Sequence, residues 1–151
     1  MLRDDDASRA GAKARRVEEL ASLVVDTGLR IHRELGPGLL ETAYEAVLAA
    51  SLTRSGVAVQ RQVAVPIEWD GVTLNEGFRL DLLIDDLLIV ELKSVEKLNP
   101  VHCKQVLTYL RLMDLPLGLL INFGAELFKH GVKRIVNNHT ATTGSNLRIH
   151  Q

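Results

Sequence analysis

The sequence lacks several features that would assign it to a particular class of protein. Its 151 residues include one cysteine, Cys103, so an intrachain disulfide and a cysteine-built zinc site are both excluded. The formal net charge is -1, so the overall basicity typical of nucleic-acid-binding domains is missing. No apolar run approaches the roughly 18 residues of a membrane span, and none resembles a signal-peptide core. These absences predict a soluble protein of a reducing, cytoplasmic compartment without membrane contact.

The composition is that of a globular domain. Hydrophobic residues make up 46% of the chain and charged residues 25%, and the length fits one domain. We expect a flexible arm at residues 1–16, a single domain at 17–137 and a flexible tail at 138–151. Residues 117–151 contain four basic residues and one acid, so the excess of acids lies before residue 117 and requires an explanation.

Apolar periodicity predicts two helices followed by three strands. Residues 17–35 and the stretch between Leu40 and Gly56 repeat apolar side chains at helical spacing, and Gly36-Pro37-Gly38 separates them as a tight turn. The period then changes to two, which predicts strands at 57–67, 72–84 and 87–93, joined by turns at Asp70-Gly71 and Asp85-Asp86.

The second half of the chain predicts one more helix and one buried strand. Asn99-Pro100 is a favourable helix start, and Pro116 ends that helix. Residues 117–123 form a continuous apolar run that is typical of a strand buried on both faces. Residues 127–136 fit either a short hairpin or a helix. The order ααβββαβ indicates a mixed α/β domain.

Three ionisable side chains are predicted to meet within otherwise apolar sequence. Alternation along a strand puts Glu91 and Lys93 on one face, and Asp81 reaches that face if strands 72–84 and 87–93 pair. Two carboxylates suit a hard divalent cation, and a lysine beside them suits phosphodiester hydrolysis. The competing interpretation is structural, with Glu91 paired to Lys93 at a sheet edge and Asp81 paired to Arg79.

The same residues resemble a known family. Asp81, nine intervening residues and Glu91-Leu92-Lys93 are similar to the signature of the PD-(D/E)XK nuclease superfamily, although Leu80 replaces the proline. The segment GLLETAYE, residues 38–45, resembles the motif of its GxxExxY branch. The resemblance covers about residues 24–137. It implies a restriction-endonuclease-like core αβββαβ with an extra N-terminal helix, in which helices flank a mixed β-sheet.

The resemblance also implies a role for each residue that matches the family pattern. Asp81 and Glu91 would hold Mg²⁺ or Mn²⁺ with the Leu92 carbonyl as a further ligand, and Lys93 would be the catalytic lysine. Glu41 would reach the metal from its helix, although an acid in the first helical turn is favoured by the helix dipole in any protein.

Two more residues match a family element on the third helix. Gln105 and Tyr109 resemble the QxxxY element that helps to shape the site and meet the nucleic acid, although an ordinary amphipathic pair would show the same spacing. Tyr44 is expected to pack in the core with its hydroxyl bonded nearby.

The partner expected from these residues is nucleic acid, with DNA favoured over RNA. Lys129, Lys133 and Arg134 are candidates for a phosphate-binding patch, although scattered solvated side chains explain them nearly as well. A homodimer would follow if the apolar residues 87–90 lay on a sheet edge. The sequence therefore predicts a nuclease dependent on Mg²⁺ or Mn²⁺, with an inactive nucleic-acid-binding or partner-binding module of the same fold as the alternative.

Overall fold

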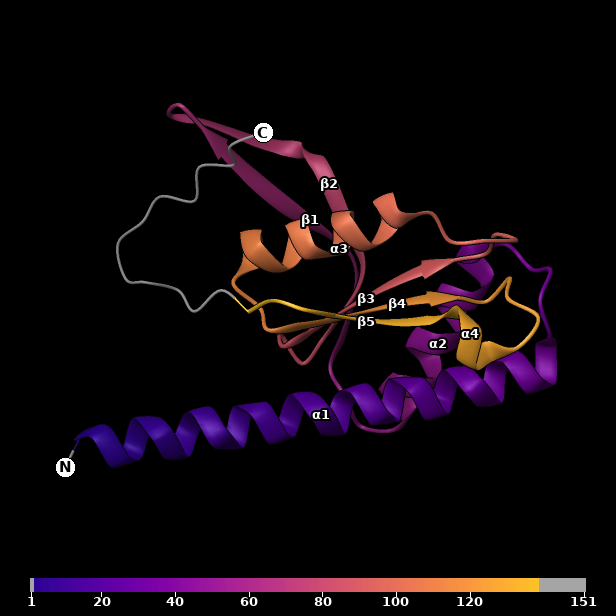
Figure 1. The fold of residues 1–151 in the computed structure, drawn as a ribbon, viewed down its shortest axis with the longest axis horizontal. Helices are drawn as coiled ribbons and strands as arrows, with labels where there is room; N and C mark the ends of the chain where they lie inside the picture. Colours follow the sequence, from indigo (N-terminus) through magenta and orange to yellow (C-terminus); the bar gives the residue numbers. More distant parts are fainter. Residues whose placement is uncertain (1, 139–151) are drawn as a thin grey trace.

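The computed structural model describes residues 2–138, which form helices around one five-stranded sheet (Figure 1). The predicted core αβββαβ with an extra N-terminal helix is confirmed. Residues 127–136 contain both a short helix and a strand. The elements are α1 (Leu2–Leu35), α2 (Glu41–Arg54), β1 (Val59–Trp69), β2 (Val72–Ile84), β3 (Leu88–Lys93), α3 (Pro100–Met113), β4 (Leu117–Asn122), α4 (Phe128–Gly131) and β5 (Val132–Val136).

The sheet is mixed, as predicted. Its strand order is β1-β2-β3-β4-β5, with β3 and β4 parallel and every other neighbouring pair antiparallel. Asp70 and Gly71 both have positive φ, of 49° and 77°, which is the backbone of a tight hairpin turn. Pro66 lies on the edge strand β1, where the register shifts between Val65 and Ile67, because proline cannot donate to a ladder.

Helices cover both faces of the sheet. On one face, side chains of β2, β3 and β4 such as Leu82 and Val90 pack with α1, α2 and α4. On the other face, Leu83 and Ile89 pack with α3. Figure 1 shows α1 along one side of the sheet and α3 on the opposite side. Because β3 is an interior strand and residues 88–90 are buried, the condition for the predicted homodimer is not met.

Helix α1 is longer than the sequence predicted. Residues 1–16 were expected to form a flexible arm, whereas α1 begins at Leu2. Alanine and arginine are frequent in this segment and favour helix, and Asp4 and Asp5 in the first turn complement the helix dipole. Arg16 anchors the helix to the turn between β2 and β3 through Asp85, at 2.7 Å. The tail predicted at 138–151 lies outside the described residues, apart from Asn138.

The turn between α1 and α2 is held by Tyr44, as predicted. Its ring is fully buried and stacks on Phe123 with 4.4 Å between the ring centroids. Its hydroxyl donates to the Gly36 carbonyl and accepts from the Leu39 N–H at 3.2 Å. Ser94, just after β3, donates to the Leu39 carbonyl at 2.6 Å. The glycine-rich segment is therefore a helix-to-helix turn tied to the end of β3.

Helix α3 lies close to the sheet and begins at the predicted cap. The Asn99 side chain accepts from the Val101 N–H at 3.1 Å, and the His102 ring accepts from the Asn99 N–H at 3.2 Å. Gly118 on β4 permits the close approach, because a Cβ there would lie 2.7 Å from a methyl carbon of Val106. No helix within residues 2–138 is long and apolar enough to cross a membrane.

Candidate active site

Two acids meet where β2 and β3 separate. The register of the two strands includes Leu82 with Val90 and stops there, so the next positions are Asp81 and Glu91. The Asp81 N–H donates to Glu91 Oε1 at 2.8 Å, and the Leu92 N–H donates to Asp81 Oδ2 at 2.8 Å. Side chains thus replace the backbone ladder, and each carboxyl group is held by the opposite strand.

Burial raises the pKa of both acids. Glu91 is 5% exposed, and burial together with the neighbouring Asp81 raises its pKa from 4.5 to about 8. Burial also raises the pKa of Asp81, and the negative charge of Glu45 adds to this shift. The two carboxyl groups are close enough to hydrogen-bond to each other, so together they retain a proton more strongly than ordinary acids.

Lys93 lies on the same strand as Glu91 and is half-buried. Its positive charge lowers the pKa of both acids, which opposes the effect of burial. The competing structural interpretation is not supported, because within the described residues neither Lys93 and Glu91 nor Arg79 and Asp81 come within 4.0 Å as ion pairs. Lys93 is therefore an electrostatic neighbour of two acids that lack a salt-bridge partner at this site.

Helix α3 brings Tyr109 to the acids. Tyr109 is 2% exposed, and burial, followed by the negative charges of Glu91 and Asp81, raises its pKa to about 12. Its hydroxyl is hydrogen-bonded to Gln105, one turn earlier on α3. The structure therefore brings both residues of the predicted QxxxY element together and puts the tyrosine within electrostatic reach of the carboxyl pair.

Three residues that the sequence did not single out form a set of contacts that reaches Asp81. Glu45 on α2 is buried and accepts from Arg61 at 2.8 Å and from Gln62 at 2.5 Å. The Gln62 amide also lies 3.3 Å from Asp81 Oδ1, so it bridges the two acids. A helical pattern could have identified Glu45, because it shares the buried face of α2 with Leu48.

Glu41 has a different environment from Glu45. It is exposed at the first residue of α2, where an acid complements the helix dipole. Glu45, one turn later, is the α2 acid whose charge raises the pKa of Asp81. The role in metal binding that the resemblance implies for Glu41 stays a prediction.

The three basic residues of the predicted phosphate patch are not brought together. Lys129 lies on α4, and Lys133 and Arg134 are adjacent on β5. Adjacent strand residues point to opposite faces of a sheet. Arg134 is hydrogen-bonded to Glu18 of α1 at 3.0 Å, so its charge is already paired. These residues therefore do not form one continuous phosphate-binding surface.

The donor set fits a magnesium-type cation and does not resemble a zinc site. Residues 2–138 contain no group of three or more His, Cys, Asp and Glu side chains that could hold a metal ion. Mg²⁺ keeps several waters and often binds through one or two carboxylates. Asp81 and Glu91 provide two such carboxylates, and a divalent cation would replace the proton that they retain.

One of the comparisons with known proteins finds a match. A sequence model described as the PD-(D/E)XK nuclease superfamily matches residues 18–135. The chain belongs to the PD-(D/E)XK nuclease superfamily. No curated protein and no solved structure matches it. The matched range contains every element from α2 to β4, and the acids at the separation of β2 and β3 lie within it.

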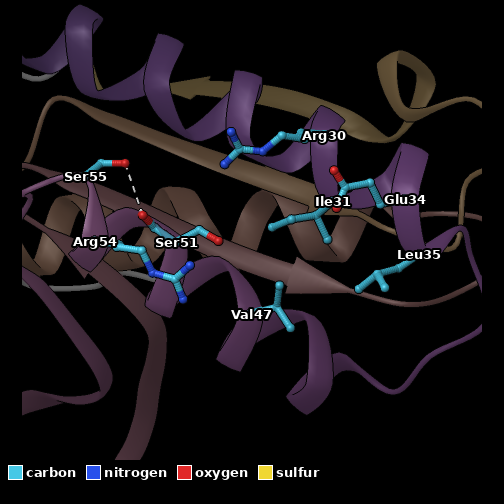
Figure 2. A pocket seen from close by; sticks show the side chains of 8 residues that line it. All are labelled: Arg30, Ile31, Glu34, Leu35, Val47, Ser51, Arg54 and Ser55. Carbon is cyan, nitrogen blue, oxygen red and sulfur yellow. Dashed lines mark hydrogen bonds between the residues drawn. The ribbon is translucent and has the colours of Figure 1, made fainter.

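An open groove of about 680 Å³ lies between α1 and α2, separate from these acids (Figure 2). Arg30 and Glu34 line it from α1, and Arg54 lines it from α2. It contains none of the residues predicted for the site. The groove therefore has no part in the chemistry assigned to Asp81 and Glu91.

Proposed function

We propose that this protein is a metal-dependent nuclease that hydrolyses phosphodiester bonds of nucleic acid, with Mg²⁺ or Mn²⁺ held by Asp81 and Glu91. The observation that carries the proposal is the meeting of a buried carboxyl group, Glu91, with a half-buried one, Asp81, each bound to the opposite strand, where β2 and β3 separate. Membership of the PD-(D/E)XK superfamily supports it. DNA is the proposed substrate in preference to RNA, and the segment 38–45 favours the GxxExxY branch.

Each residue of the site has a distinct role in this proposal. Asp81 and Glu91 bind the cation, with the Leu92 carbonyl as a further ligand. A bound divalent cation supplies a Lewis acid for the phosphoryl group and lowers the pKa of bound water. Lys93 orients the attacking water and offsets the charge that develops on the phosphorane. Tyr109, whose pKa is raised to about 12, keeps its proton at neutral pH and well above it, and acts as a hydrogen-bond donor.

The proposal keeps Glu41 as a metal-binding candidate and adds Glu45 as a second α2 acid linked to the site. Glu45 is buried and linked to Asp81 through the Gln62 amide, whereas Glu41 is exposed. A buried carboxylate without a function would be costly to keep, even when it is paired with an arginine such as Arg61.

Cleavage assays with DNA and RNA substrates test the function. Purified protein should cleave nucleic acid only when Mg²⁺ or Mn²⁺ is present. Lys93→Met should lower the rate by about 100-fold or more, because it removes the charge and keeps the stem length. Lys13→Met changes an exposed lysine of α1 and should leave the rate unchanged. Cleavage that persists at full rate in EDTA would refute the metal-dependent mechanism.

The alternative is a binding module that keeps the fold without catalysis. The net charge of -1 and the separation of the basic residues favour it. Isothermal calorimetry separates the two functions. A nuclease should bind Mg²⁺ more tightly than its Asp81→Asn variant, whereas an inactive module should bind nucleic acid and show no difference in Mg²⁺ affinity between the two proteins.

A further inference from the structure

Gln62 has an unusual backbone conformation at the site. Its φ is 52°, in the left-handed region, although it lies inside strand β1. The pairs Arg61 with Leu82 and Val63 with Leu80 keep a constant register, so no inserted residue explains the distortion. Within residues 2–138 the other positive-φ residues besides glycine are all aspartates at turns or at a helix end: Asp70, Asp85, Asp86 and Asp114.

The conformation directs the Gln62 amide between two acids. Gln62 lies between the paired residues Arg61 and Val63, and Asp81 lies between their partners Leu82 and Leu80, so the two residues face each other across the strands although they are not themselves a ladder pair. Its Nε2 lies 2.5 Å from Glu45 Oε1 and 3.3 Å from Asp81 Oδ1, while Arg61 occupies the other oxygen of Glu45 at 2.8 Å. A neutral donor in this place holds both carboxylates without adding charge. Strained backbone of this kind often occurs at functional sites.

Asp81 is thereby fixed through both of its oxygens. Oδ2 accepts from the Leu92 N–H at 2.8 Å, and Oδ1 faces the Gln62 amide. The Gln62 carbonyl in turn accepts from Arg79 at 3.4 Å. The orientation of the Asp81 carboxylate therefore depends on one residue of β3 and one residue of β1.

We propose that Gln62 is a positioning residue, whose left-handed backbone places its amide between Glu45 and Asp81 and so orients Asp81 for the divalent cation. This inference rests on the proposed function of the site. It assigns a role to a side chain that does not itself bind the metal. Loss of the amide should weaken metal binding, whereas a residue that adopts the left-handed backbone freely should relieve the strain at this position.

The variant Gln62→Gly separates these two effects, because glycine adopts positive φ without strain. We expect Mn²⁺ affinity, measured by calorimetry, to fall about 10-fold. The melting temperature should change little, because relief of the backbone strain offsets the lost hydrogen bonds to Glu45 and Asp81. Gln62→Asn tolerates the same backbone but is one carbon shorter, so it should also lose affinity. The matched control is Asp114→Gly, which relieves a φ of 54° at the end of α3 and should leave Mn²⁺ affinity unchanged.

Two results would overturn the positioning role. One is wild-type Mn²⁺ affinity in Gln62→Gly. The other is a crystal structure of metal-free Gln62→Gly in which Asp81 keeps its rotamer and its bond to the Leu92 N–H. A wild-type protein that binds no Mn²⁺ would refute the metal-dependent nuclease instead, and the crystal structure would still decide whether Gln62 orients Asp81.

Discussion

The two ends of the β2–β3 pair differ sharply within a few residues. The closed end is the one next to the Asp85-Asp86 turn. There, Leu83 pairs with Ile89 and Ile84 with Leu88 through the backbone, and all four are buried among apolar side chains. At the open end, Asp81 and Glu91 replace the ladder with side-chain bonds, and their pKa values are raised. The closed end stabilises the fold, whereas the open end retains two acids, one buried and one half-buried, whose raised pKa values make ionisation unfavourable until a cation binds.

The largest expected effect is on activity at the open end. Asp81→Asn keeps the size of the side chain and its acceptor for the Leu92 N–H, but removes the negative charge that binds the cation. We expect cleavage to fall by about 10³-fold or more, with the fold intact by circular dichroism. Activity within a few-fold of the wild-type protein would show that Asp81 is not a metal ligand.

The same comparison predicts the opposite outcome at the closed end. Leu83→Ala removes a side chain that is 4% exposed and packs against α3, two residues from Asp81. The free energy of unfolding should fall by about 2–4 kcal/mol in urea titrations. The rate of cleavage per folded molecule should change little. A loss of activity as large as that of Asp81→Asn would remove the distinction between the two ends.

The raised pKa of Glu91 predicts how stability depends on pH in the absence of metal. Between pH 4.5 and about 8 the folded protein keeps a proton that the unfolded chain releases. The stability that this proton gives to the folded protein is therefore fully present below pH 4.5 and is lost as the pH rises through 8.

The difference in unfolding free energy between wild type and Glu91→Gln isolates this contribution. Relative to the variant, wild type should lose about 1–3 kcal/mol from pH 5 to pH 8, within the limit of roughly 1.4 kcal/mol per pH unit for one proton. Saturating Mg²⁺ should restore the lost stability in the wild-type protein but not in Glu91→Gln, because a ligand that binds the folded state stabilises it. A pH-independent difference would mean that Glu91 is ionised throughout.

The smallest expected effect lies outside both ends, at the turn that joins α1 and α2. Tyr44→Phe keeps the stack on Phe123 but removes the hydroxyl bonds to Gly36 and Leu39. We expect a loss of about 1–2 kcal/mol in the free energy of unfolding. Metal affinity should remain within about two-fold of wild type, since the hydroxyl contacts the turn and not the acids. A larger change in metal affinity would place Tyr44 in the site.

Local signals made much of the fold predictable from the sequence. Asp70-Gly71, the Asn99 cap and the apolar run of β4 each depend on residues close together in the chain. The meeting of Asp81 and Glu91 was also predictable, because the turn at Asp85-Asp86 pairs the two strands and alternation along each strand then puts both side chains on one face.

The features that could not be predicted from the sequence depend on tertiary packing. The left-handed backbone of Gln62 and its bridge to Glu45 depend on where α2 lies relative to β1, which no local pattern encodes. The separation of Lys133 and Arg134 could have been predicted had residues 132–136 been assigned to a strand. The start of α1 was missed because three aspartates beside basic and small residues were interpreted as an arm.

The account rests on one claim, that Asp81 and Glu91 together hold a divalent cation. A crystal of the wild-type protein soaked in Mn²⁺ tests it most directly, because manganese gives an anomalous signal. The account predicts an anomalous peak between the two carboxylates, absent from an Asp81→Asn crystal soaked in the same way. A soaked wild-type crystal with no peak there, and with Asp81 and Glu91 still bonded only to the opposite strands, would contradict it.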